Sequence, residues 1–211
     1  MADAELEGRE LGVRRGYRTI FRGIDLSLRR GELLQVIGPN GAGKSSLLRV
    51  LSSLMPPAVG NLYWQGRPVR AGDPDYLARL AYLGHTNGIY PDLSAIENLQ
   101  FAARMAGQRP TADAARRALS ELGLDGVADA PVRTLSQGQR RRVALARLAL
   151  TPCELWLLDE PVTSLDEASS AGFDALLARH LHHGGMAVIA THQRLRADGA
   201  VLNLDLALAR T

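Results

Sequence analysis

The sequence contains almost no cysteine, a single lysine and no long apolar run, and each shortage excludes a class of protein. Cys153 is the one cysteine among 211 residues, so the chain can form no internal disulfide and no cysteine-based zinc site. The most apolar stretches, such as Met186–Ala190, are far shorter than the roughly 18 residues that indicate a membrane-spanning helix. The first ten residues are acidic and lack the apolar stretch of a secretory signal. We therefore expect a chain that stays in the reducing cytoplasm.

Lysine is the more informative shortage. Of 25 basic residues only Lys44 is a lysine, and the arginines are scattered from Arg9 to Arg210. Scattered arginines with a net charge of +3 do not indicate a nucleic-acid partner. Arginine is planar and always charged, whereas the lysine ammonium is a compact, strongly hydrated point charge. The composition therefore indicates that position 44 needs that point charge.

The apolar pattern predicts alternating strands and helices in one domain, 1–211. Leu33–Ile37, Leu155–Leu158 and Met186–Ala190 are continuous apolar runs, typical of strands buried on both faces of a parallel sheet. Ile24–Leu28 and Asn61–Trp64 alternate apolar and polar residues, which indicates an antiparallel flank. Helices without an intervening strand predict a helical subdomain at about 94–132. The expected helices are 45–54, 94–106, 112–122, 136–150 and 166–182, with a last strand at 201–208.

A glycine-rich loop follows the first buried strand. Residues 38–45 read GPNGAGKS, the P-loop pattern, and lie between a predicted strand and a predicted helix. Glycines let successive amides and the helix start point at phosphate oxygens. Lys44 would reach the β- and γ-phosphates, and Ser45 would bind Mg²⁺. The residues expected to hold the nucleotide are Gly38, Pro39, Asn40, Gly41, Ala42, Gly43, Lys44, Ser45 and Ser46.

Two carboxylates end the strand of residues 155–158. Asp159 is predicted to lie beside the metal and Glu160 beside the attacking water, because phosphoryl transfer to water needs both roles. Two acids before Pro161 could instead begin an ordinary turn. Their place downstream of a P-loop favours the catalytic interpretation.

A second phosphate-directed helix start reads LSQGQ at 135–139, with Ser136 at the cap. This segment, directly before a helix and some twenty residues ahead of the acidic strand, resembles the LSGGQ signature of the ABC ATPase family. The resemblance implies an α/β P-loop NTPase fold of ABC type, with a mainly parallel core, an antiparallel flank and a helical subdomain. It also implies that Ser136, Gly138 and Gln139 contact ATP bound by a second copy of the chain.

The same family supplies roles for two further segments. Residues 164–166 (SLD) resemble its dimer-contacting loop, and His192 resembles its γ-phosphate-sensing histidine. Alone, such a histidine is more often a packed or surface residue, but the order and spacing of five motifs favour the catalytic role. Arg140–Arg142 could form an anion site; we interpret them as the solvated face of the signature helix.

Two positions depart from the family pattern. His85 stands where the family has a metal-coupling glutamine, and imidazole is shorter and titrates near neutrality. Arg15 aligns with the aromatic residue that covers adenine, with Tyr17 two places on. Either side chain could cover the base, by cation–π contact or by stacking.

His85 in YLGH, the run LSQGQRRRVALARL, the segment GGMAVIATHQ and the short tail resemble the ATP-binding proteins of cytochrome c maturation systems. The resemblance implies Mg²⁺-dependent ATP hydrolysis coupled to haem export or delivery. It implies integral membrane permease partners and a peripheral position on the cytoplasmic face of the bacterial inner membrane. Haem binding is left to those partners, because the chain has no CxxCH and His180, His182 and His183 lie at a helix end.

Three alternatives stay open. The chain could serve another small ABC exporter. It could be a soluble ABC ATPase acting on nucleic acid or ribosomes, although such proteins usually carry a coiled-coil insertion or two cassettes. It could be a regulator that no longer hydrolyses ATP, against which Lys44, Asp159 and Glu160 argue.

Overall fold

The chain divides into two compact units. The computed structural model describes residues 4–163, 165–192 and 200–207. The first unit comprises Met1–Gly84, Cys153–Glu160 and Ala178–Thr211, and the second comprises His85–Pro152 and Pro161–Leu177. No helix among the described residues is long and apolar enough to cross a membrane.

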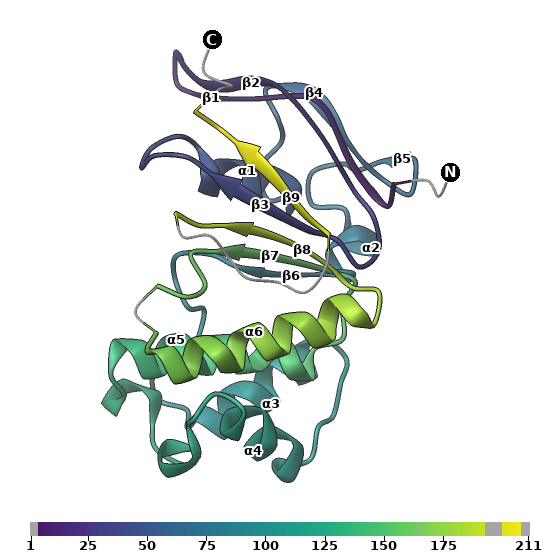
Figure 1. Ribbon diagram of the computed structural model, residues 1–211. Coiled ribbons are helices and arrows are strands. Elements are labelled where there is room, and N and C mark those ends of the chain that lie inside the picture. Colours follow the sequence, from purple (N-terminus) through teal and green to yellow (C-terminus); the bar gives the residue numbers. More distant parts are fainter. Residues whose placement is uncertain (1–3, 164, 193–199, 208–211) are drawn as a thin grey trace. The chain divides into compact units, whose positions relative to one another are not determined.

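A five-stranded parallel sheet forms the centre of the first unit, in the order β6-β7-β8-β3-β9 (Figure 1). Every residue of β7 and β8 is buried, and so are the first four residues of β3. Their continuous apolar sequences therefore match burial on both faces. The strands are β3 (Leu33–Ile37), β6 (Leu80–Leu83), β7 (Leu155–Asp159), β8 (Met186–Ala190) and β9 (Val201–Asp205).

An antiparallel sheet of the order β2-β1-β4-β5 belongs to the same unit. Helix α1 (Lys44–Leu51) packs against β1 of this sheet and against β7 and β8 of the parallel sheet (Figure 1). The short helix α2 (Pro74–Leu77) is capped by Asp73. The strands are β1 (Leu6–Arg15), β2 (Arg18–Leu28), β4 (Val59–Trp64) and β5 (Arg67–Pro68).

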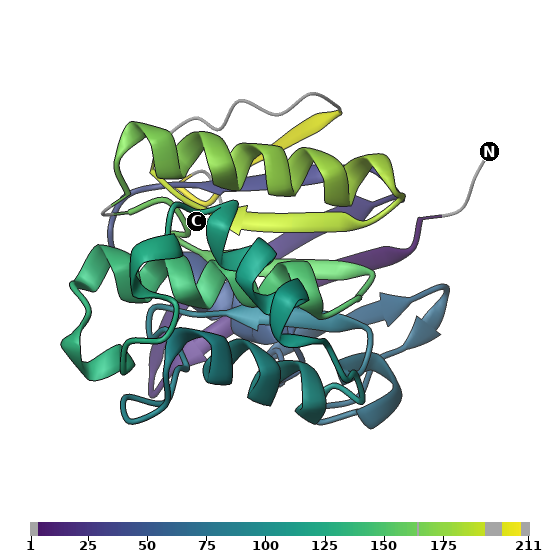
Figure 2. The same ribbon diagram turned by 90° about the horizontal axis from the view of Figure 1, so that it is seen from below.

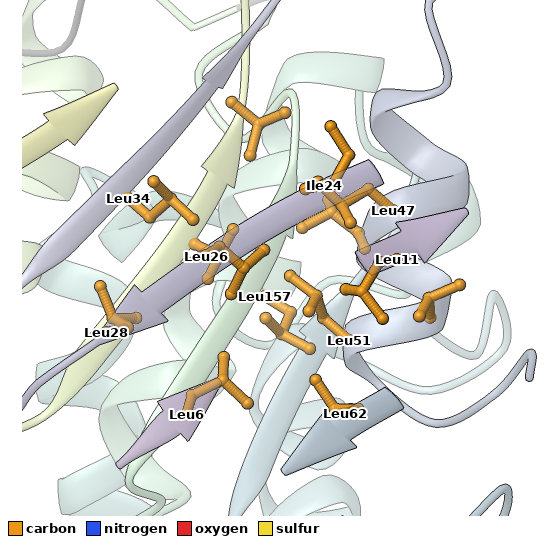
Figure 3. Packing of buried hydrophobic residues seen from close by; sticks show 14 of the residues in the cluster. Leu6, Leu11, Ile24, Leu26, Leu28, Leu34, Leu47, Leu51, Leu62 and Leu157 are labelled. Carbon is orange, nitrogen blue, oxygen red and sulfur yellow. The ribbon is translucent and has the colours of Figure 1, made fainter. Parts of the chain in front are cut away.

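Leucines from both sheets and from α1 form one core (Figure 3). Leu47 and Leu51 of α1 are fully buried, and they share this core with Leu157 of β7 and with Leu11 and Leu62 of the antiparallel sheet. Burying a leucine side chain stabilises a fold by about 1.5–3 kcal/mol. The helix that follows the P-loop is therefore held on two sides.

The second unit is helical. α3 (Ala95–Met105), α4 (Ala112–Ser120) and α5 (Gln137–Ala146) pack against one another, and Figure 2 shows them in teal and green. Ser94 and Glu97 form a capping box at the start of α3. Capping boxes satisfy amides that the first helical turn leaves unpaired. The remaining helices are η1 (Asp125–Val127), η2 (Val132–Thr134), η3 (Arg147–Leu150) and α6 (Glu167–His182), which ends in the first unit.

The predicted fold class is confirmed, and the differences lie at element boundaries. The helix expected at 136–150 is α5 followed by the 3-10 helix η3, and the helix expected at 45–54 ends at Leu51. The last strand ends at Asp205, and residue 208 lies outside the described residues. The apolar pattern did not predict the full lengths of β1 and β2. The assignment of 1–211 to one domain with a helical subdomain at about 94–132 stays a prediction.

Candidate active site

The predicted P-loop, acidic pair and histidine all follow neighbouring strands of the parallel sheet. Val36 of β3 and Asp159 of β7 both pair with Ala190 at the end of β8. The carboxyl ends of parallel strands lie at one edge of a sheet, where ligands bind in open α/β folds. Segments far apart in sequence therefore meet at this edge.

The loop after β3 uses backbone conformations that favour glycine. Gly41 has φ 75° and Gly43 has φ 105°, both in the left-handed region. A Cβ on Gly43 would lie 2.6 Å from Cγ2 of Ile20 and 2.8 Å from Cδ1 of Phe21, both in β2. Glycine at position 43 thus lets the loop approach the antiparallel sheet and turn directly into α1.

Lys44 begins α1 and points back along the loop. Its Nζ donates to the carbonyl oxygens of Gly38 at 2.7 Å and Pro39 at 3.4 Å, and the residue is 8% exposed. No side chain caps α1, and its first turn carries no acid. The first amides of a helix without a cap suit an anion, and the helix dipole favours one there. The loop can therefore surround a phosphate chain.

Asp159 and Glu160 occupy the end of β7. Asp159 is 4% exposed, and Glu160 has a φ of 48°. That left-handed conformation costs a residue other than glycine roughly 1–3 kcal/mol, and residues before proline normally adopt an extended backbone. Such strain is concentrated at functional sites. The Glu160 amide donates to the carbonyl oxygen of Ala190 at 2.8 Å.

His192 follows β8 and lies against Glu160. Its Nδ1 is 3.1 Å from Oε2 of Glu160, and its side chain is 57% exposed. Sequence reasoning placed both residues in the site but did not predict this contact. The catalytic roles of Lys44, Glu160 and His192 stay predictions.

The signature residues belong to the second unit and cap their own helix. Oγ of Ser136 accepts from the Gln139 amide at 3.2 Å, and Oε1 of Gln139 accepts from the Ser136 amide at 2.8 Å. The Ser136 hydroxyl retains its own proton, which it can donate. The start of α5 is thus fixed while a hydroxyl donor stays at its tip. Contact of Ser136, Gly138 and Gln139 with a partner's nucleotide stays a prediction.

The interpretation of Arg140–Arg142 as a solvated face is wrong for Arg141. Arg141 is 6% exposed and donates to acceptors in two other segments. Arg140 and Arg142 are half-buried, with hydrogen bonds to backbone carbonyls. A guanidinium has five donors, so folding can bury it where acceptors converge, and a sequence pattern does not show those acceptors.

Three further predicted positions are placed as follows. His85 is exposed and follows β6, and its metal role stays a prediction. Arg15 ends β1 and Tyr17 lies in the turn before β2, where its side chain is fully exposed. The covering of adenine by either residue stays a prediction. In the predicted dimer-contacting loop 164–166, residue 164 lies outside the described residues.

The three histidines near the end of α6 differ in their burial. His182 and His183 are exposed, but His180 is half-buried and stacks on Trp156 with ring centroids 3.8 Å apart. Its Nε2–H donates to the carbonyl oxygen of Met186 at 3.0 Å. Burial lowers the pKa of His180, and the charge of His183 acts in the same direction.

Comparison with known families gives the class of protein. The family model described as "ABC transporter" matches residues 21–163, a range that contains the P-loop, the signature and the acidic pair. The chain belongs to the ABC transporter family. The expectation of an ATP-binding, ATP-hydrolysing protein of ABC type is thereby confirmed.

Curated relatives narrow the resemblance within that family. The chain is 76% identical over 204 residues to "Cytochrome c biogenesis ATP-binding export protein CcmA 2" of Cupriavidus metallidurans, with 97% of each chain covered. It is 61% identical to the CcmA protein of Cupriavidus necator, over 92% of this chain and 86% of that one. The predicted likeness to this group of ATP-binding proteins is confirmed.

Solved structures agree with the fold. An ABC transporter ATP-binding protein of Pyrococcus furiosus is 26% identical, with a TM-score of 0.85 and coverage of 98% and 99% of the two chains. A dimeric ATP-binding cassette bound to ADP and phosphate is 24% identical, with a TM-score of 0.77 over 89% of this chain and 88% of that one. This second likeness concerns the fold alone.

Proposed function

We propose that this chain is the ATP-hydrolysing subunit of a membrane ABC transporter complex that serves c-type cytochrome biogenesis by haem export or delivery. The observation that carries the proposal is the 76% identity, along nearly the whole chain, to a protein named for cytochrome c biogenesis and export. A small exporter of another cargo remains the second candidate. Nothing observed favours a nucleic-acid or ribosome partner.

The residues at the sheet edge fit Mg²⁺ bound together with ATP. Among the described residues no group of three His, Cys, Asp or Glu could hold a metal alone. Mg²⁺ in nucleotide sites is instead bound by one or two protein oxygens together with substrate phosphates. Ser45 in the first turn of α1 and the buried residue Asp159 would supply that pair of oxygens. When bound, Mg²⁺ would neutralise charge that develops on the phosphates.

In this proposal Glu160 and His192 direct the attacking water. The Glu160 carboxylate would accept a hydrogen bond from the attacking water and polarise it. The contact between Oε2 of Glu160 and Nδ1 of His192 fixes one carboxylate oxygen. With both ring nitrogens protonated, His192 could donate from Nδ1 to Glu160 and from Nε2 to a γ-phosphate oxygen. Lys44 and the loop amides would stabilise the phosphate charge.

A second copy of the chain would complete each ATP site. In this proposal Ser136, Gly138 and Gln139 at the start of α5 face the γ-phosphate held by the partner's P-loop. The helix start and its hydroxyl donor suit an anion. Two bound ATP molecules then close the dimer, and hydrolysis lets it reopen.

The dimer would act on integral membrane permease subunits of the cytochrome c maturation system. The chain is accordingly proposed to be a peripheral protein on the cytoplasmic face of the inner membrane. Membrane attachment is assigned to those partners in this proposal.

The decisive experiment replaces Lys44 with Ala in the source cell. Membrane and periplasmic fractions are stained for covalently bound haem, and an immunoblot checks that the variant accumulates. We expect loss of all c-type cytochromes with other haem proteins intact, because the variant lacks the cation that reaches the phosphates. Unchanged staining would exclude a role in cytochrome c biogenesis and favour another exporter.

A further inference from the structure

Arg141 is a buried cation outside the predicted catalytic set. The residue is 6% exposed, and burial removes the water that would otherwise solvate its guanidinium. Two other segments supply acceptors: Nε lies 3.3 Å from the carbonyl oxygen of Pro161, and Nη1 lies 3.1 Å from Oδ1 of Asn87. One side chain of α5 therefore connects three parts of the second unit.

The Pro161 contact adjoins the predicted catalytic carboxylate. Pro161 directly follows Glu160, whose φ of 48° is rare outside glycine. Proline has no amide hydrogen, so its carbonyl is the backbone group through which a hydrogen bond can hold this residue. On the preceding side the Glu160 amide donates to Ala190. Hydrogen bonds therefore fix the backbone on both sides of the strained Glu160. Arg141 provides the one on the Pro161 side.

The Asn87 contact gives Arg141 a fixed support. The carbonyl oxygens of Asn87 and Gly88 also accept from Nη1 of Arg147, at 3.3 Å and 2.6 Å. Asn98 of α3, 2% exposed, accepts from the Tyr90 amide at 2.7 Å and donates to its carbonyl oxygen at 2.9 Å. Hydrogen bonds therefore fix both ends of residues 87–90, and Arg141 donates to the first of these residues.

We propose that Arg141 is a positioning residue for Glu160. It lies in the second turn of α5, about 7 Å along the helix axis from the Ser136 cap. Its hydrogen bond thereby holds the Pro161 carbonyl, which belongs to the residue bonded directly to Glu160. Arg141 acts through Pro161 and touches no reacting atom itself. This inference rests on the proposed ATPase function.

The test compares Arg141→Met with Arg141→Lys in the purified chain. For Arg141→Met we expect kcat for ATP hydrolysis to fall by about ten- to a hundredfold, since small misplacements of catalytic groups cost that much. KM, and the Kd of a fluorescent ATP analogue, should change by less than about twofold. Arg141→Lys should restore part of the lost kcat, because an ammonium keeps the charge and can reach one of the two acceptors.

Arg140→Met is the matched control. Arg140 is the neighbour on the same helix and also donates to carbonyl oxygens, those of Val132 and Arg133, but serves neither Pro161 nor Asn87. The kcat of Arg140→Met should stay within about twofold of that of the wild type.

Asn87→Ala removes the Oδ1 acceptor of Arg141 but leaves every side chain of α5 in place. It should lower kcat by about three- to tenfold with KM unchanged. That variant decides the question if Arg141→Met does not fold.

A Glu160→Gln background separates positioning from a general role. In single-turnover hydrolysis, adding Arg141→Met to Glu160→Gln should cause little further loss, because residues that act as a unit are not additive. The proposal is overturned if the loss in the double variant equals the product of the two single losses. It is also overturned if kcat is unchanged in both Arg141→Met and Asn87→Ala, or if kcat and Kd change in parallel. If the wild-type chain does not hydrolyse ATP, the proposed function is overturned as well. If the wild-type chain hydrolyses ATP and the variants are equally active, this inference alone is overturned.

Discussion

The two ends of the parallel sheet in the first unit differ in how their charged side chains are arranged. Before the strands, charged side chains pair with one another: Glu154 binds Arg30 at 2.7 Å and Arg79 at 2.6 Å, and Arg30 also binds Glu5 at 2.9 Å. After the strands, Nζ of Lys44 donates to backbone carbonyl oxygens, and Oε2 of Glu160 lies 3.1 Å from Nδ1 of His192. Glutamates and arginines pair with one another at one end, whereas the other end carries the side chains predicted to act on the nucleotide.

This difference separates stability from activity within one sheet. Ion pairs between partly exposed side chains stabilise a fold modestly. Strained or buried charges at the opposite edge cost stability and are tolerated where function needs them. Substitutions before the strands should therefore change stability, and substitutions after them should change turnover.

Glu160→Gln should have the largest effect, on turnover alone. The amide cannot polarise water, so kcat should fall by about a hundred- to a thousandfold while ATP binding persists. ATP-bound dimers should then accumulate, which size-exclusion chromatography with ATP measures. The midpoint of thermal unfolding should stay near that of wild type. Hydrolysis within about threefold of wild type would remove Glu160 from the role of base.

Glu154→Gln should have a moderate effect, on stability alone. The change removes the charge that binds Arg30 and Arg79, whose side chains are 52% and 45% exposed. We expect the free energy of unfolding to fall by about 1 kcal/mol and the melting temperature by about 2–4 °C. Calorimetry measures both, and kcat per folded molecule should not change.

Asp129→Asn is the control for that substitution. It breaks one exposed pair, between Asp129 and Arg116 at 2.8 Å, in the second unit. The stability loss should be smaller than for Glu154→Gln. An equal or larger loss would show that the network before the strands contributes no more than a single surface pair.

The smallest effect concerns pH and His180. Burial lowers the pKa of His180 below its ordinary value of 6.5, so the unfolded chain takes up a proton more readily than the folded one. The stabilisation is complete above the ordinary pKa and is lost as the pH falls through 6.5 toward the folded pKa. Urea unfolding from about pH 8 to about pH 5 measures the decline.

His180→Phe gives the matched variant for the pH experiment. Phenylalanine can keep the stacked contact with Trp156 but takes up no proton. Its stability should decline less than that of wild type over the same pH range. Parallel curves for the two proteins would assign the decline to other groups.

Much of the site could be predicted because its chemistry depends on local sequence. The loop of residues 38–45 needs left-handed backbone conformations and a lysine. Its glycines and the single lysine of the chain indicate both requirements in the sequence. The buried strands β7 and β8 were predictable because full burial demands continuous apolar residues. The family's motif order predicted that Glu160 and His192 lie near the nucleotide.

Other features could not be predicted because they depend on contacts between distant residues. In the sequence Arg141 is one of three consecutive arginines, a pattern typical of exposed residues. Its acceptors on Pro161 and Asn87 lie 20 and 54 positions away along the chain. The left-handed φ of Glu160 is not encoded by a glycine. Periodicity likewise showed the helix of residues 136–150 but not its change to η3.

The sequence by itself determined the α/β class, the phosphate-binding loop and the kinship to ABC proteins, because backbone freedom, burial and helix starts are local requirements. Only the tertiary structure decided how charged side chains are arranged: glutamates pair with arginines before the strands, Glu160 contacts His192 after them, and Arg141 is buried in the second unit. The physical reason is that the free energy of a charge depends on its acceptors and on its access to water. Folding brings those acceptors together from distant parts of the chain.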